Sequence, residues 1–77
     1  MLKLKDKYVN LVNEAQKNGD FNRLTDRQKA VLTARFGLED GVHRTTREVD
    51  AITGVNKSKN VIHEALGRLF KYANARD

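Results

Sequence analysis

Apolar residues recur at spacings of three and four positions along nearly all of this chain, and after the first five residues they do not alternate regularly with polar ones. Spacings of three and four place side chains on one face of an α-helix, whereas a half-buried strand requires alternation. The pattern therefore predicts an all-α fold with four helices, over residues 2–18, 25–36, 47–53 and 57–74.

The second and third predicted helices each begin with the sequence pattern of a capping box. Thr25 is followed three positions later by Gln28, and Thr45 by Glu48. In such a pair the threonine hydroxyl and the later side chain each accept a hydrogen bond from the other residue's backbone N–H. Glycines, which tolerate the left-handed conformation at a helix end, follow the first three helices. They are Gly19, Gly37 and Gly54.

A chain of 77 residues without cysteine depends on one small hydrophobic core, because disulfides and thiolate metal sites are excluded. We expect one domain in which an N-terminal amphipathic helix, residues 1–22, packs on residues 23–77. No apolar run approaches the ~20 residues that cross a bilayer. We therefore expect no membrane association and a cytoplasmic protein.

Side chains that could carry chemistry are sparse, whereas positive charge is abundant. His43 and His63 are the only candidate nitrogen ligands, and no Ser/His/Asp grouping has an interpretable spacing. We predict neither an enzyme nor a metal or cofactor site. Fifteen Lys and Arg residues against ten Asp and Glu give a net charge of +5, which favours a polyanionic partner.

The short third helix and the longer fourth one match a helix-turn-helix over residues 46–66. Gly54 would take a positive φ in the turn, Val55 would fill the angle between the helices, and Val49 and Ile52 would point inward. The fourth helix would then present its first turns to a DNA major groove. An ordinary helical hairpin is the alternative interpretation.

Three stretches add a family resemblance. They are Leu24-Thr25-Asp26-Arg27-Gln28 with the later Val31-Leu32 and Arg35-Phe36-Gly37-Leu38, then Arg44-Thr45-Thr46-Arg47-Glu48-Val49, then Gly54-Val55. In order and spacing they resemble region 4 of bacterial sigma-70-type factors, over about residues 24–70. The resemblance implies recognition of the −35 promoter element and docking on the flap of the RNA polymerase β subunit.

The resemblance weakens after Gly54-Val55, where family members usually read T-R-E-R-V-R-Q-I-E. Here Asn56 replaces the threonine cap, Lys57 an arginine and Ser58 the base-reading glutamate, and Val61 comes one position late. The altered segment favours, as an alternative, an adaptor that has lost DNA reading.

The predicted DNA contacts lie around the beginnings of the third and fourth helices. Lysines there suit phosphates and an asparagine suits adenine, although a solvated helix start is the alternative for each. For the arginines, a salt bridge to Glu48 or Asp50 is the alternative. The candidates are Arg44, Arg47, Asn56, Lys57, Ser58, Lys59, Asn60 and His63. Lys3, Lys5 and Lys7 form a further basic cluster, which we interpret either as functional or as a frayed terminus.

Four apolar residues are candidates for a polymerase-docking groove. The family resemblance implies a cleft between the first region-4 helix and the end of the last one, which receives the flap-tip helix. The alternative is that all four belong to the core. They are Leu32, Phe36, Leu69 and Phe70.

The leading hypothesis is a sigma region-4-like transcription protein that binds the RNA polymerase β flap and upstream promoter DNA. A second is an adaptor that occupies the flap or mimics region 4 toward an anti-sigma-type protein, and a third is a dimeric helix-turn-helix repressor. The chain is interpreted either as a fragment of a longer sigma factor or as a free-standing protein such as a phage-encoded one, and the separate stop signal of the N-terminal helix favours the second. We expect it at the nucleoid of a bacterial or phage-infected cell.

Overall fold

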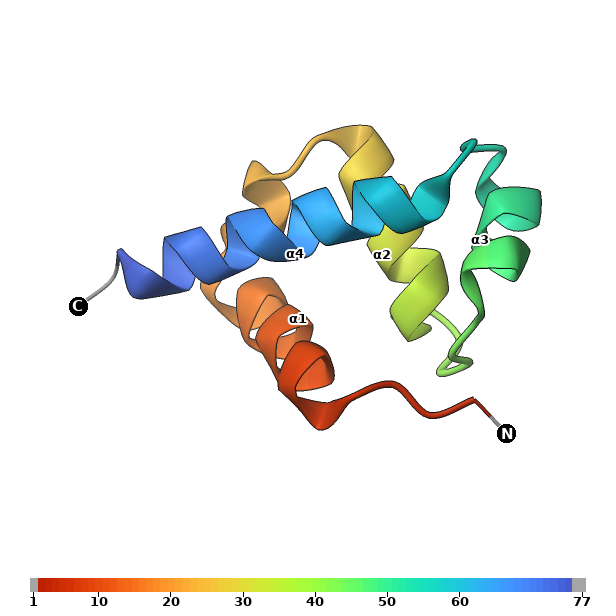
Figure 1. Cartoon of the computed structure of the whole chain (residues 1–77). Coiled ribbons are helices and arrows are strands. Elements are labelled where there is room, and N and C mark those ends of the chain that lie inside the picture. Colours follow the sequence, from red (N-terminus) through yellow and green to blue (C-terminus); the bar gives the residue numbers. More distant parts are fainter. Residues whose placement is uncertain (1, 76–77) are drawn as a thin grey trace.

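The computed structural model describes residues 2–75, and over this range it contains four α-helices, one short 3-10 helix and no strand. The all-α prediction is confirmed. Figure 1 shows α4 lying across α1 and α2, with α3 at the end where α4 begins. The elements are α1 (Asp6–Asn18), η1 (Asp20–Arg23), α2 (Asp26–Phe36), α3 (Thr46–Thr53) and α4 (Ser58–Asn74).

The first helix begins later than its periodicity predicted. Residues 2–5 lie outside the helix, with Lys5 in an extended conformation at φ −65° and ψ 134°, and α1 starts at Asp6. The lysines before Asp6 offer no acceptor for the first N–H groups, whereas the Asp6 carboxylate is favourable at a helix N-terminus. The segment 2–5, which we call the N-terminal arm, is nevertheless held by the buried side chain of Leu4.

Both predicted capping boxes are present and fix the starts of α2 and α3. Gln28 N donates to Thr25 Oγ1 at 3.1 Å, and Thr25 N donates to Gln28 Oε1 at 3.0 Å. Glu48 N donates to Thr45 Oγ1 at 3.2 Å, and Thr45 N donates to Glu48 Oε1 at 3.0 Å. These reciprocal bonds satisfy backbone donors that the first helical turn leaves without partners.

Gly37 ends α2 at a close approach of two backbone segments. It has φ +60°, and a Cβ atom there would overlap the backbone of Val42. Only glycine combines this positive φ with the absence of a side chain, so the loop after α2 can fold back tightly against the helix end.

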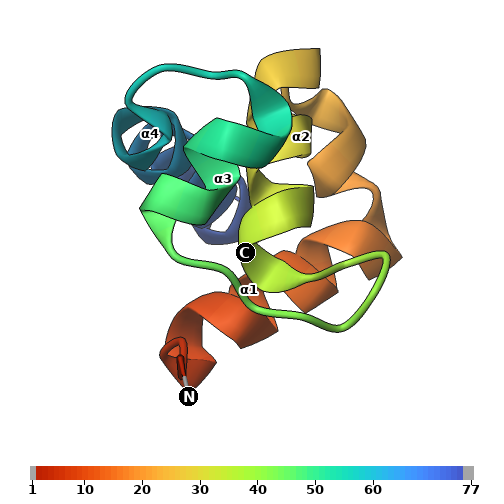
Figure 2. The same cartoon turned by 90° about the vertical axis from the view of Figure 1, so that its right-hand side faces the viewer.

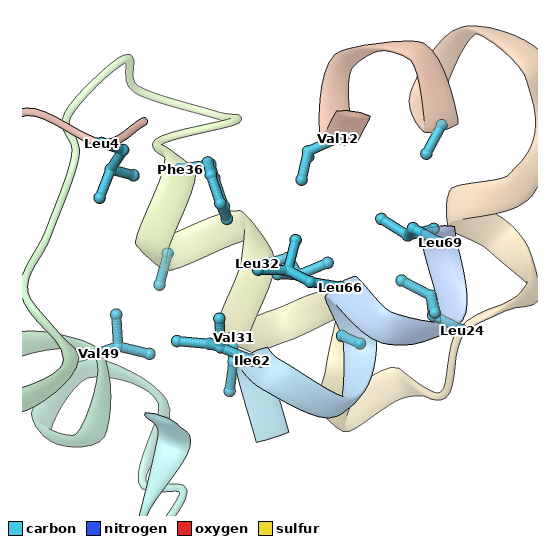
Figure 3. Packing of buried hydrophobic residues seen from close by; sticks show 13 residues of the cluster. Leu4, Val12, Leu24, Val31, Leu32, Phe36, Val49, Ile62, Leu66 and Leu69 are labelled. Atoms are coloured by element: carbon cyan, nitrogen blue, oxygen red, sulfur yellow. The ribbon is translucent and has the colours of Figure 1, made fainter. Parts of the chain in front are cut away.

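The core lies between α2 and α4 and is closed by α1 and α3. Figure 3 shows Leu32 and Leu66 meeting in its middle, with Leu4 beside Phe36 and Val49 beside Val31. The buried apolar residues are Leu4, Val12, Ala15, Leu24, Val31, Leu32, Ala34, Phe36, Val49, Ile62, Ala65, Leu66 and Leu69.

The predicted inward position of Ile52 is wrong, since its side chain is 59% exposed while Val49 is fully buried. Thr53, four positions after Val49, is half-buried and donates its hydroxyl to the Val49 carbonyl at 2.7 Å. In an eight-residue helix the choice between i+3 and i+4 is set by the neighbouring elements, not by periodicity alone.

Two further features of α4 were not settled by its sequence. Gly67 is exposed, and a Cβ atom there would meet nothing within 4 Å, so this glycine does not mark a close helix contact. Gln28 is buried and donates from Nε2 to Glu64 Oε1 at 2.8 Å, which links α2 to α4.

None of the helices in the described residues is both long and apolar enough to cross a membrane.

Candidate nucleic-acid interface

The start of α4 is held against α3 by two hydrogen bonds that one serine donates. Ser58 N donates to Asp50 Oδ1 at 2.8 Å, and Ser58 Oγ donates to the Thr46 carbonyl at 3.0 Å. The serine side chain has no exposed surface. Hydrogen bonding from Ser58 lowers the pKa of Asp50 below its ordinary value. A carboxylate from one helix therefore caps the next one and sets the geometry of the pair.

The turn between α3 and α4 contains two residues in the left-handed region. Gly54 has φ +71°, as predicted, and Lys57 has φ +55°. Among the described residues Lys57 is the only non-glycine with a positive φ, a conformation that an L side chain adopts rarely. Val55 is half-buried against the core, and its N–H donates to Thr53 Oγ1 at 3.2 Å.

Asn56 does not cap α4, which corrects the interpretation of its place in the sequence. The N-cap position is Lys57, and its side chain makes no capping hydrogen bond. The acceptor comes from Asp50, eight positions before Ser58. From the sequence, Asp50 was expected only as an alternative ion-pair partner of the arginines. Local capping rules do not find it, because the acceptor lies on the preceding helix.

The helix register also removes Ser58 from the predicted DNA contacts. Ile62 is the first buried apolar residue of α4, and Val61 is only half-buried. Since Ser58 and Ile62 are four positions apart, both face inward. The exposed side chains of the first two turns are Lys59, Asn60, His63 and Glu64, and Glu64 accepts the hydrogen bond from Gln28.

A cluster of exposed cations surrounds this helix start. Arg47 at the beginning of α3, Lys57 in the turn and Lys59 in α4 are all exposed, and so is Asn56. Within residues 2–75 the ion pairs shorter than 4.0 Å involve Lys17, Arg23, Lys29 and Arg44, and not these three cations. Figure 2 looks at the end of the molecule where α3 and the start of α4 lie side by side. Three charges without a carboxylate partner therefore gather where α3 and α4 meet.

Arg44 holds the loop after α2 instead of joining that cluster. Its guanidinium pairs with Asp40 and donates to the carbonyls of Ala34 and Val42, each at 3.2 Å. The Asp40 hydrogen bond raises the pKa of Arg44, and the Arg44 hydrogen bond lowers the pKa of Asp40. Arg44 therefore has a structural role in this loop, and its ion-pair partner is Asp40 and not Glu48 or Asp50. Its contact with DNA stays a prediction.

A second set of bonds ties the same loop to α2. Arg35 Nη1 donates to the Arg44 carbonyl at 2.6 Å, and Arg44 N donates to the Arg35 carbonyl at 3.1 Å. Partial burial lowers the pKa of Arg35. These backbone contacts position Thr45 as the cap of α3, so the R-F-G-L and R-T-x-x-E-V stretches are joined in space.

The four predicted docking residues fall into two groups. Leu32 and Leu69 are 0% and 1% exposed, so they are core residues that no partner reaches, which corrects that prediction. Phe36 and Phe70 line a groove of about 510 Å³ between the N-terminal arm and α4. Phe36 is itself largely buried, while Phe70 is half-buried and meets Tyr8 edge to face, with ring centroids 6.0 Å apart.

Comparison with known proteins shows a local similarity to sigma factors. The chain is 50% identical over 36 residues to the RNA polymerase sigma factor SigA of Listeria monocytogenes, and equally to that of Listeria innocua. The aligned residues are 47% of this chain and 10% of each relative, so the chain corresponds to about a tenth of their length. No protein-family model matches the chain, and no solved structure matches it significantly.

The fold and the comparison together define a small all-α protein with a sigma-factor-related region. That region covers about half of the chain.

Proposed function

We propose that this chain is a non-catalytic, sigma region-4-like transcription protein. In this proposal α3 and α4 form a helix-turn-helix that contacts upstream, −35-like promoter DNA, and the domain also binds the β flap of bacterial RNA polymerase. The protein would act in the cytoplasm, at the nucleoid of a bacterial or phage-infected cell. The local identity to SigA supports the sigma-like part of this proposal.

The observation that supports DNA binding is the set of three exposed cations, Arg47, Lys57 and Lys59, which form no ion pair among the described residues. They lie at the start of α4, which the hydrogen bond to Asp50 fixes. Lysine and arginine neutralise phosphates, and rigid placement fixes the register of a helix on the duplex. Asn60 and His63, on the exposed face of the first two turns, are the side chains left to reach base edges.

A salt titration of DNA binding tests this half. The variant Lys57→Gln/Lys59→Gln removes two charges while keeping side-chain length. The matched control, Lys17→Gln/Lys71→Gln, removes two exposed charges from the last turns of α1 and α4, with Lys71 roughly 20 Å along α4 from its start. If both lysines at the start of α4 contact phosphate, Lys57→Gln/Lys59→Gln lowers the magnitude of the negative slope of log K against log salt by ~1.8. The control keeps the wild-type slope.

Two results would contradict the DNA half. One is wild-type affinity that does not change with salt, and the other is no association with DNA even in the presence of polymerase. Either result would leave the second candidate, an adaptor that binds polymerase or an anti-sigma-type protein without reading DNA. The burial of Ser58, at the place of the family's base-reading glutamate, favours that candidate.

A further inference from the structure

The N-terminal arm has one buried side, formed by Leu4, and one exposed side, formed by Lys3 and Lys5. Successive side chains of an extended segment point to opposite sides. Leu4 is buried at 8% exposure, while Lys3 and Lys5 on either side of it are exposed. One leucine anchors the arm to the core, so the two ammonium groups are held on the surface.

The arm lies beside the start of the candidate interface. Lys3 and Lys5 line the same 510 Å³ groove as Lys59 and His63 of α4. Thr46, the first residue of α3, lines it too. In Figure 2 the arm and the first turns of α4 lie on the same side of the molecule, with the beginning of α3 between them.

The described residues that line the groove carry positive charge. They include Lys3, Lys5, Arg35 and Lys59, and within residues 2–75 no aspartate or glutamate lines the groove. Among the described residues, Lys3, Lys5 and Lys59 form no ion pair within 4.0 Å. Neighbouring like charges repel one another and create a positive potential that attracts an anion. The buried side chain of Leu4 anchors the arm, so that Lys3 and Lys5 line the same groove as Lys59.

We propose that the N-terminal arm is a second DNA-contacting element, in which Lys3 and Lys5 neutralise phosphates next to those bound at the start of α4. This inference rests on the proposed function, since it extends the same interface. The contacted surface would run from Arg47 and Lys57 through Lys59 to the arm, so the duplex backbone would be held on both sides of the helix start.

The test compares three double variants in salt titrations with a short double-stranded DNA of mixed sequence, followed by fluorescence anisotropy between ~50 and ~200 mM salt. Lys3→Gln/Lys5→Gln removes the arm charges and leaves Leu4 in place. Lys3→Arg/Lys5→Arg keeps them, and Lys17→Gln/Lys71→Gln is the control for net charge. Circular dichroism checks that each variant keeps the helical content of the wild type.

We expect Lys3→Gln/Lys5→Gln to lower the magnitude of the salt slope by ~1.8, about 0.9 for each lost phosphate contact. The arginine variant and the control should keep the wild-type slope. If the wild type shows a steep slope and Lys3→Gln/Lys5→Gln shows the same one, the inference is wrong and the proposed function stands.

Two other outcomes separate the alternatives. If wild-type binding does not depend on salt at all, the proposed DNA function fails, and the role of the arm fails with it. If the arm variant keeps the DNA slope but binds core RNA polymerase less tightly than the control, the arm lysines contact protein instead, which also overturns the inference.

Discussion

Asp50 of α3 accepts a hydrogen bond from the backbone N–H of Ser58 at 2.8 Å, and this contact links the two helices of the candidate interface. The buried Ser58 hydroxyl completes the clamp by donating to the Thr46 carbonyl. The start of α4 is thereby fixed relative to α3 without a capping residue in the turn itself.

Replacing Asp50 by alanine should lower the melting temperature and weaken DNA binding, because the first N–H of α4 loses its acceptor and the helix start is released. Asp50→Asn is the matched control, since its amide oxygen can still accept that hydrogen bond. Thermal unfolding and DNA titration measure the two effects. If Asp50→Asn and Asp50→Ala lose the same melting temperature and the same DNA affinity, then the negative charge of Asp50 matters, and not its hydrogen bond to the N–H of Ser58.

The stability of the protein should decrease in acid. Hydrogen bonds lower the pKa of Asp40, Glu48 and Asp50 below their ordinary values of 3.8, 4.5 and 3.8. The folded chain therefore binds fewer protons than the unfolded chain between the lowered and the ordinary values. Because unfolding takes up protons in that window, the free energy of unfolding falls as the pH drops through it, and these groups contribute no pH dependence well above it.

Urea unfolding at a series of pH values between ~2 and ~6 measures this dependence. The variant Asp40→Asn/Asp50→Asn removes two of the three groups and should give a shallower decline in acid than the wild type. A wild-type stability that rises as the pH falls below 4 would contradict the assignment of lowered pKa values to these carboxylates.

Gly37→Ala should destabilise the fold more than Gly41→Ala. Both glycines have a positive φ, so alanine is strained at each, but only at Gly37 would the added methyl group overlap the backbone of Val42. The difference between the two variants therefore isolates the close approach of the loop to the end of α2. Denaturant unfolding measures it, and equal free-energy losses would mean that backbone strain alone accounts for Gly37.

Phe70→Ala and Leu69→Ala should separate docking from core packing. Leu69 is 1% exposed, so its truncation should lower the free energy of unfolding by about 2–5 kcal/mol. Phe70 is half-buried and lines the groove beside the arm, so its truncation should reduce binding to core RNA polymerase while leaving most of the stability. Unfolding curves and a polymerase-binding assay provide the two readouts. Unchanged polymerase affinity in Phe70→Ala would remove the groove as the docking site.

Local sequence signals determined much of the fold. The capping boxes of Thr25 and Thr45 and the left-handed glycines Gly37 and Gly54 all occur as predicted. Each depends on residues within three or four positions, where backbone geometry alone brings the groups together. The number of helices and the buried stripe of α4 follow from the same short-range periodicity.

Tertiary structure decided which of the polar and apolar candidates are available to a partner. Ser58 turns inward because Asp50 and Thr46, eight and twelve positions earlier, bind it. Arg44 holds a loop because Ala34 and Arg35 lie ten and nine positions away in the sequence but adjacent in space. Leu4 places two lysines beside α4 because its side chain reaches the core. These outcomes depend on which helices pack together, and periodicity and capping, being local, do not contain that information.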